Sequence, residues 1–375
     1  MANTYDDIIP KILAQGLSVL RGVTIMPRLV NRNYDGAAAE QGSVINVPIP
    51  PSVTTVPVTP SATAPDAAGV TFSTTPVELA YHEEAPFAMG DKERTEVMVG
   101  AESMAVRSAA ISLGNRINST ILTAMDVGAS VAVGTAGTRP FGTLDLADAP
   151  FTLLDEHLIG PEDRRCIFAP NAKGRLLALP EMTSRDFVND MSALQNGTFS
   201  GQTNLGASWW SSAAVPTHTR GTANTAYDVN SGGGLAVGAT TIPVDTGTGT
   251  ILAGDVVTFA GDTENQYVVA TALASGSFTI AAPGLKVAIA DNADVTVAAA
   301  HRSNFAFQRE AIVAAFCPFQ ASSAGLVATD QMMDEETGIS LRVEVIRQHK
   351  RDRWSLDAMW GTKVVRPEGV IKIMG

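Results

Sequence analysis

The sequence predicts an α+β fold that combines one long helix, several strands and a small all-β domain inserted into the chain. Residues 91–126 contain no proline and repeat apolar residues at steps of three and four, which is the period of a helix with one buried face. Short strand patterns separated by turn residues fill residues 222–300. Helix and strand patterns alternate on both sides of that segment, which indicates a mixed fold around an insertion.

The size and composition of the chain indicate a large globular protein. Its 375 residues are 45% apolar, enough for about two or three domains with a large core. The formal net charge of −12 argues against a protein that binds nucleic acid through a broad basic face. Cys166 and Cys317 neither require nor exclude a disulfide, so we expect a reducing compartment.

Residues 1–42 are predicted to form an N-terminal arm with one or two short helices. Pro10 and Gly16 interrupt its apolar pattern, so two readings stay open: an extended arm against a partner, and a helix packed on the chain's own core. The first residues carry acids where a signal peptide is basic, and no apolar run reaches transmembrane length. We therefore expect a protein made in a cytoplasm, with no membrane span.

Residues 43–86 are predicted to form a long two-stranded hairpin with a tip rich in proline. Because proline cannot donate a ladder hydrogen bond, neither strand can be central in a sheet. The tip has too few bulky apolar residues to form a core of its own. We therefore expect this hairpin to be either flexible or laid over another subunit.

The helix 91–126 would be roughly 50 Å long. Its expected buried stripe consists of residues at helical spacing: Val97, Ala101, Met104, Ala105, Ala109, Leu113, Ile117, Ile121 and Met125. After it, the patterns predict an α/β unit with helices at 145–159, 170–179 and 184–195 and a strand at 165–169. The pair Trp209-Trp210 near the end of this unit marks either an interface or the anchor of a loop on its own core.

The segment 222–300 differs from the rest of the chain in composition and charge. Residues 221–300 hold six Asp and one Glu against one Lys and no Arg, a net charge of −6. Short strands recur at about ten-residue spacing, as in a small β barrel or sandwich. Because α/β character resumes at Asn304, the segment is expected to be an inserted domain.

The C-terminal region is predicted to contain an antiparallel hairpin, since residues 339–348 and 354–360 both alternate between apolar and polar side chains. Residues 342–366 carry seven Lys or Arg against three acids. This basic stretch indicates either contact with an acidic neighbour or nucleic acid, or a solvated strand face, and the sequence favours neither.

The sequence offers no catalytic, cofactor-binding or metal-ligating constellation. It has no Gly-x-Ser-x-Gly elbow, no phosphate-binding loop and no Cys-x-x-Cys pair. The five histidines do not have the spacing of metal ligands. We therefore expect no enzymatic activity, no cofactor and no metal.

The order of arm, proline-rich hairpin, long helix, α/β unit and closing strands resembles the major capsid (coat) proteins of tailed bacteriophages. The stretches GISLRVEVIRQ (338–348) and RWSLDAMWGTKVVRPEGVIKIMG (353–375) are similar to the family's closing strands. The segment FAFQREAIVAAFCPF (305–319) is similar to the return from the inserted domain. The insertion at 222–300 resembles the subgroup that carries an extra β barrel.

The resemblance implies a tailed-phage major capsid fold with named parts. These are an N-terminal arm (1–42), an extended β-hairpin loop (43–86), a peripheral domain (87–145 and 326–366) with the spine helix 91–126, an axial domain (146–221 and 301–325), an inserted β-barrel domain (222–300) and a C-terminal strand (367–375).

The resemblance also implies a structural subunit that assembles into hexamers and pentamers of an icosahedral head around double-stranded DNA, contacted without sequence specificity. Some members crosslink through a lysine of the extended loop, but no lysine lies between Lys11 and Lys92, so no crosslinking is expected. The short arm implies a separate scaffolding protein, and a portal is a further partner. The expected location is the virion, after assembly in the bacterial host cytoplasm.

Two alternatives stay open at this point. One is a cellular nanocompartment shell protein, which has the same fold as the coat proteins. The other is a glycan-binding or hydrolytic protein that uses the β segment 222–300.

Overall fold

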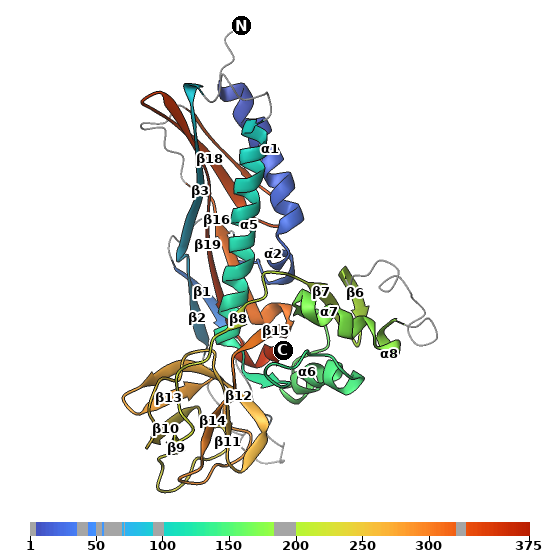
Figure 1. Ribbon diagram of the computed structural model, residues 1–375, viewed down its shortest axis with the longest axis vertical. Coiled ribbons are helices and arrows are strands. Elements are labelled where there is room, and N and C mark those ends of the chain that lie inside the picture. Colours follow the sequence, from blue (N-terminus) through green and yellow to red (C-terminus); the bar gives the residue numbers. More distant parts are fainter. Residues whose placement is uncertain are drawn as a thin grey trace, which may run out of the picture.

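The computed structural model describes residues 5–35, 44–49, 55, 70, 72–92, 101–183, 200–319 and 328–375. The molecule is elongated, with a long sheet and two long helices at one end and a second sheet with shorter helices at the other (Figure 1). A further group of strands, β9 to β14, extends the second end.

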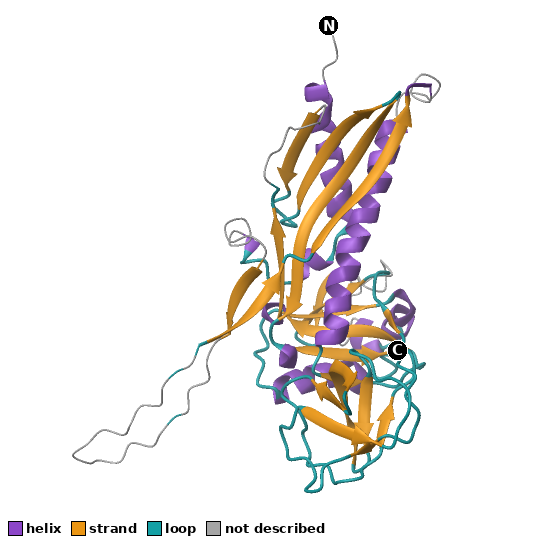
Figure 2. Cartoon of the chain, turned by 90° about the vertical axis from the view of Figure 1, so that its left-hand side faces the viewer, coloured by secondary structure: helices purple, strands orange, loops and turns teal. Residues whose placement is uncertain are grey.

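The helices α1 (Tyr5–Val23) and α5 (Ala101–Gly128) lie side by side along one face of the long sheet (Figures 1 and 2). The buried side chains of α5 follow helical spacing: Val106, Ala110, Leu113, Ile117, Ile121, Leu122 and Met125. The predicted stripe is right from Leu113 onward, but Met104 is 74% exposed. Met104 lies two residues, or about 200°, from Val106 around the helix, which places it on the opposite side. Residues 93–100 of the predicted helix lie outside the described residues.

The helix α1 packs on the chain's own core, which decides between the two readings left open for the N-terminal arm 1–42 in favour of a packed helix. Five apolar side chains at helical spacing are buried: Ile9, Ile12, Leu13, Leu17 and Leu20. The short helix α2 (Met26–Leu29) follows. Asn118 of α5 fixes the turn between them, because its Oδ1 accepts from the backbone N–H groups of Ile25 and Met26, each at 3.1 Å, and its Nδ2 donates to the carbonyl of Val23 at 2.9 Å.

The long sheet consists of β3 (Tyr81–Gly90), β16 (Ile312–Cys317), β17 (Ala328–Met333), β18 (Ser340–Gln348) and β19 (Arg351–Val364). The strand β19 is its centre and pairs with β3, β16 and β18. The predicted C-terminal hairpin is confirmed, because β18 and β19 pair antiparallel up to the contact between Gln348 and Arg351. Alternate side chains of both strands, such as Val343 and Leu356, are buried in the core that includes α1 and α5.

The stem of the predicted hairpin forms a separate two-stranded sheet of β1 (Val44–Ile49) and β2 (Ser73–Glu78), which projects beside the long sheet (Figure 2). Ile45, Val47 and Val77 are buried, and Val47 and Val77 pack with Val313 of β16. The predicted boundary at residue 86 needs correction. The strand β3 starts at Tyr81 and pairs with β19, so residues 81–86 belong to the long sheet. The tip lies mostly outside the described residues.

The second sheet contains β4 (Val131–Val133), β5 (Arg164–Phe168), β6 (Ser200–Asn204), β7 (Ala207–Ser211), β8 (Thr217–His218), β15 (His301–Gln308) and β20 (Val370–Met374). The helices α6 (Leu144–Glu156), α7 (Pro170–Leu177) and α8 (Pro180–Thr183) lie beside it, with 3₁₀ turns at Arg309–Ala311 and Pro367–Gly369. The predicted helix 184–195 lies outside the described residues. Trp209 is fully buried, with Phe141 and Phe151 edge-on to its ring, so it anchors a core.

Two expected domain boundaries differ from the sheets observed. The strand β4 lies in the range expected for the peripheral domain, yet it pairs with β20 in the second sheet. The strand β16 lies in the range expected for the axial domain, yet it pairs with β19 in the long sheet. In both cases the chain passes from one part of the fold to the other within a few residues. The spacing of apolar residues in the sequence gives no sign of these crossings.

Residues 222–300, called the β block from here on, contain β9 (Asp228–Val229), β10 (Thr241–Asp245), β11 (Val256–Phe259), β12 (Asp262–Ala274), β13 (Ser277–Ile280) and β14 (Val295–Val297). These strands pair in the order β14-β11-β12-β13-β10-β9. Backbone hydrogen bonds from Val229 to Ala293 and from Val295 to Tyr227 join β9 back to β14, so the order closes on itself. The strand β12 also pairs with β4, which links the β block to the second sheet.

Candidate functional site

The β block enters and leaves the rest of the chain through two paired strands. His218 of β8 lies opposite His301 of β15, and Thr217 lies opposite Arg302. The two imidazole rings are 5.4 Å apart between centroids. This two-strand stem, together with the end of α5 and with β20, forms the junction of the β block.

Both ring nitrogens of His218 contact carboxylates. Its Nδ1 lies 2.7 Å from Oδ2 of Asp126, near the C-terminal end of α5, and its Nε2 lies 2.9 Å from Oδ1 of Asp255, just before β11. His218, Asp126 and Asp255 are all buried. The imidazole therefore bridges the spine helix and the β block directly.

Lys372 of β20 supplies a second buried cation to this cluster. Its Nζ lies 2.8 Å from Oδ1 of Asp126 and donates to the backbone carbonyl of Gly254 at 2.7 Å. Asp255 also accepts from the backbone N–H groups of Gly221 and Leu252, with the Leu252 bond at 2.7 Å. Two carboxylates and two basic side chains thus meet at the point where three parts of the chain join.

Gly254 lets the chain pass close to His218. Its φ of +91° is one that a side chain disfavours, and an added Cβ would lie 2.8 Å from Cε1 of His218. A larger residue would therefore push the segment that carries Asp255 away from the imidazole.

The cluster changes the protonation of its members. Burial disfavours the charged imidazole, but the hydrogen bonds to Asp126 and Asp255 outweigh burial and raise the pKa of His218 to about 9. Burial likewise opposes ionisation of Asp126, but His218 and Lys372 hold the pKa of this carboxyl well below its usual range. Burial lowers the pKa of both Lys372 and His301.

This cluster does not have the features of a catalytic site. An Asp–His pair that activates a nucleophile needs a hydroxyl or thiol on the free ring nitrogen, whereas both nitrogens of His218 face carboxylates. The His218 side chain is 8% exposed, which leaves little access for a substrate. The described residues also contain no group of three or more His, Cys, Asp or Glu arranged to hold a metal ion.

Sequence reasoning missed the junction because its members are far apart in the chain. His218 is separated from Asp126 by 92 residues and from Asp255 by 37. Such separations carry no local spacing signal. An unexpected lysine at the centre of the apolar run Val370–Met374 is the one hint that the sequence contains.

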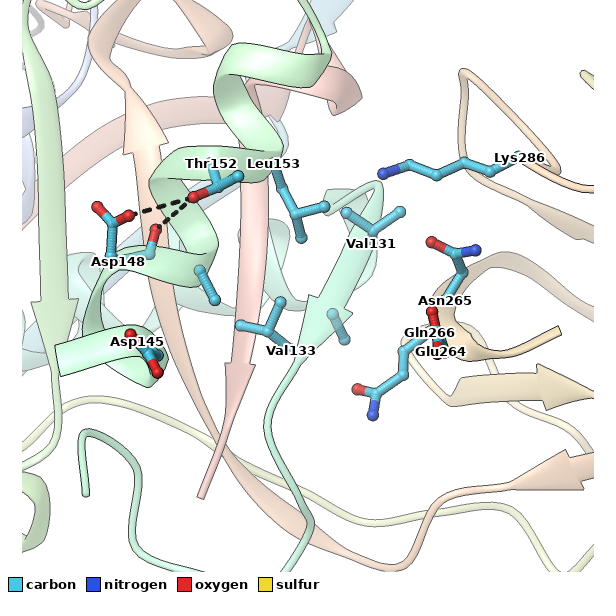
Figure 3. A pocket seen from close by; sticks show the side chains of 12 residues that line it. Val131, Val133, Asp145, Asp148, Thr152, Leu153, Glu264, Asn265, Gln266 and Lys286 are labelled. Atoms are coloured by element: carbon cyan, nitrogen blue, oxygen red, sulfur yellow. Dashed lines mark hydrogen bonds between the residues drawn. The ribbon is translucent and has the colours of Figure 1, made fainter. Parts of the chain in front are cut away.

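A surface groove of about 400 Å³ lies beside the junction, between α6, β4 and β12 (Figure 3). Val131 and Val133 form its floor, and the carboxylates of Asp145, Asp148 and Glu264 lie around it. Thr152 donates to Oδ2 of Asp148 at 3.3 Å within α6. Lys286 of the β block pairs with Glu156 of α6 at 2.6 Å, which is a second, exposed contact across this seam.

The basic segment 342–366 is largely paired within the chain, which favours the reading as a strand face over a surface for DNA. Arg342 pairs with Asp357 and Glu344, and Arg347 pairs with Asp91 and Asp352. Two further pairs involve Arg353 with Glu84 and Arg366 with Glu368. The guanidinium of Arg342 also stacks 4.0 Å from the ring centre of Phe319.

The strand β17 forms one edge of the long sheet among the strands that the structure describes. Its last residues, Met332 and Met333, are 40% and 51% exposed. They line a groove with Ala14, Leu17 and Arg21 of α1. An edge strand with exposed apolar side chains is a surface suited to pairing with another chain.

Comparison with known proteins gives a relationship of fold. No protein-family model matches the chain, and no curated protein matches its sequence. The chain is similar to a solved structure from Mycobacterium phage Che8, at 16% identity and a TM-score of 0.54, over 93% of this chain and 90% of that one. It is also similar to the capsid structure of the cyanophage P-SCSP1u, at 12% identity and a TM-score of 0.50, over 89% of this chain and 83% of that one.

Because the sequence identities are low, these comparisons show a similarity of fold alone. The coverage shows that this similarity extends over nearly the whole chain. The predicted resemblance in fold is thereby confirmed. The chain has the fold of a phage capsid structure.

Proposed function

We propose that this protein is the major capsid protein of a tailed bacteriophage, a structural subunit that assembles into the hexamers and pentamers of an icosahedral head around double-stranded DNA. The observation that carries the proposal is the similarity to the cyanophage capsid structure over 89% of the chain. A match of this extent leaves only about a tenth of the chain outside the similarity.

The parts of the molecule have separate roles in this proposal. The long sheet with α1 and α5 is the peripheral domain, and the second sheet with α6 to α8 is the axial domain near the local symmetry axes. The β block is an inserted barrel domain. The hairpin that begins with β1 and β2 is the extended loop that reaches a neighbouring subunit.

Contacts between copies are expected to be non-covalent. Among the described strands, β17 is an edge of the long sheet, and with Met332 and Met333 it offers backbone groups and apolar side chains to a second copy. The pairing of Arg342, Arg347 and Arg353 with carboxylates of the same chain reduces the positive charge that β18 and β19 offer to DNA, so DNA contacts would be weak and non-specific. The location is the virion, after assembly in the bacterial cytoplasm with a scaffolding protein and a portal.

No helix in the described parts of the chain is long and apolar enough to cross a membrane. Light scattering and electron microscopy of the purified protein, with and without a co-expressed scaffolding protein, should give large symmetric particles. Only monomers under all conditions of salt and scaffold would contradict the proposal.

A pair of variants tests the edge strand separately. Met332→Lys combined with Met333→Lys should block particle formation, because two charges at an edge oppose strand pairing. The matched control is Val237→Lys in the β block, where the native side chain is 65% exposed and distant in sequence from the edge. DNA recovered from particles made during phage growth would separate a virus head from a cellular nanocompartment.

A further inference from the structure

The junction of the β block has a hydrogen-bonding requirement that only one protonation state of His218 meets. An ionised carboxylate can accept hydrogen bonds but cannot donate them. Nδ1 faces Oδ2 of Asp126 at 2.7 Å, and Nε2 faces Oδ1 of Asp255 at 2.9 Å. Both ring nitrogens must therefore carry a proton for both contacts to be hydrogen bonds.

The surroundings of the two carboxylates favour their ionised forms. Asp255 accepts from two backbone N–H groups besides His218, those of Gly221 and Leu252. Asp126 has the ammonium group of Lys372 2.8 Å from its Oδ1. A proton on either carboxylate would remove the negative charge that these donors stabilise, so the proton belongs on the imidazole.

Charge balance leads to the same assignment. The groups that face His218 are Asp126 from α5, Asp255 from the segment before β11, Lys372 from β20 and His301 from β15. With His218 positive and His301 neutral, the buried cluster has two positive and two negative charges. Removing one proton from His218 leaves a net negative charge in a site with little water, which is costly.

We propose that His218 is a doubly protonated clamp that fastens the β block to the end of the spine helix α5, and that loss of one ring proton at alkaline pH loosens this attachment. The proposal does not depend on the assignment as a capsid protein. It concerns how firmly residues 222–300 are held against the second sheet. The two parts also share a hydrophobic core, pair through β4 and β12, and make the polar contacts Gln266–Gly134 and Lys286–Glu156.

The direction of the pH effect follows from the pKa of His218. Its folded-state pKa of about 9 exceeds the usual value of about 6.5, so the clamp contributes fully below pH 6.5 and is lost as the pH rises through 9. The lowered pKa of Asp126 acts in the acid range, where the contribution is lost as the pH falls below about 4. The lowered pKa of Lys372 means that the lysine also loses charge earlier than usual on alkaline titration.

Histidine-selective ¹⁵N NMR tests the protonation state directly. It can be recorded in solution for subunits, or by magic-angle spinning for assembled particles. The resonances of His218, assigned with His218→Gln, should show two protonated ring nitrogens at pH 7 and a titration midpoint near pH 9. One unprotonated ring nitrogen at pH 7, or a midpoint at or below about 6.5, would overturn the proposal.

A matched pair of variants tests the role of the carboxylate from the β block. Asp255→Asn should lower the midpoint of His218 by about 1–3 pH units, because an opposite charge in contact is removed. Asp291→Asn removes the same charge from the β block at an exposed position that does not contact His218, and it should leave the midpoint unchanged. Equal shifts in the two variants would show a general charge effect instead of a clamp.

Amide hydrogen exchange measures whether the attachment itself loosens. After correction for the intrinsic rate, the Gly221 and Leu252 amides that bond to Asp255 should lose about tenfold or more of their protection between pH 7 and 10. Amides of Val343 and Leu356 in the long sheet serve as the internal reference. Unchanged protection at Gly221 and Leu252 through the titration of His218 would contradict the release.

Discussion

Arg342 and Asp357 form a two-pronged ion pair across strands β18 and β19, with Nε 3.1 Å from Oδ1 and Nη2 2.5 Å from Oδ2. The side chain of Asp357 is only 4% exposed and that of Arg342 only 15%. Asp357→Ala should therefore destabilise the subunit by about 3 kcal/mol, because it leaves a guanidinium poorly solvated and partly unpaired. Urea unfolding of unassembled subunits measures this loss.

The pair Arg353–Glu84 on the same sheet is the control. Glu84 is 46% exposed, so Glu84→Ala should cost only about 0–1 kcal/mol. If both variants lost the same stability, burial would not be what makes the Arg342–Asp357 pair strong.

The contact between Gly128 and Val364 predicts a size-dependent effect at the end of α5. A Cβ added at Gly128 would lie 2.6 Å from Cβ of Val364, which is too close for two non-bonded carbon atoms. Gly128→Ala should lower the thermal midpoint, and Val364→Ala in the same chain should restore part of the loss. Gly174 of α7 has no atom within 4 Å of an added Cβ, so Gly174→Ala should instead stabilise the protein by about 1 kcal/mol.

Asp35 should make the subunit less stable at neutral pH than in mild acid. Burial raises the pKa of Asp35 to about 6, against the hydrogen bond from the backbone N–H of Phe316 at 2.9 Å. The folded state thus favours the protonated form, and stability falls as the pH rises from about 4 through 6. Asp35→Asn should gain up to about 2 kcal/mol at pH 7.5 and little at pH 4. An equal gain at both pH values would exclude this cause.

The β block is expected to fold when residues 222–300 are expressed alone. Its strand order closes through the bonds between β9 and β14, and its interior is lined by its own buried residues, such as Ile242, Phe259 and Phe278. Amide NMR spectra should be well dispersed, with β-type shifts. A collapsed, undispersed spectrum would mean that the pairing of β12 with β4 is needed for folding.

The parts of the fold that the sequence predicted are those with a local repeat. The stripe from Leu113 to Met125, the alternation of β18 and β19, and the turn-separated strands of the β block each follow from neighbours within ten or so residues. The positions of the prolines predicted the hairpin stem. They did not predict its end at Glu78, because the composition of β3 is similar although β3 belongs to another sheet.

The remaining features depend on contacts between distant residues. The packing of α1 is decided by the surface of α5 and the long sheet, which the apolar pattern around Pro10 does not reveal. The basic run 342–366 is paired partly by Glu84 and Asp91, which lie about 250 residues away or more. The cluster around His218 was missed for the same reason, since each partner comes from a different element.

The pairing of β8 with β15 determines which domains could replace the β block. Because the chain leaves at Thr217-His218 and returns directly opposite at His301-Arg302, the ends of any replacement for residues 222–300 need to meet at the spacing of one strand pair. A foreign domain with adjacent termini could be grafted there without altering the path of the host chain. The grafted domain must place a carboxylate at the position of Asp255, or His218 must be replaced together with the β block. The junction therefore limits the domains that it accepts by charge as well as by the spacing of their termini.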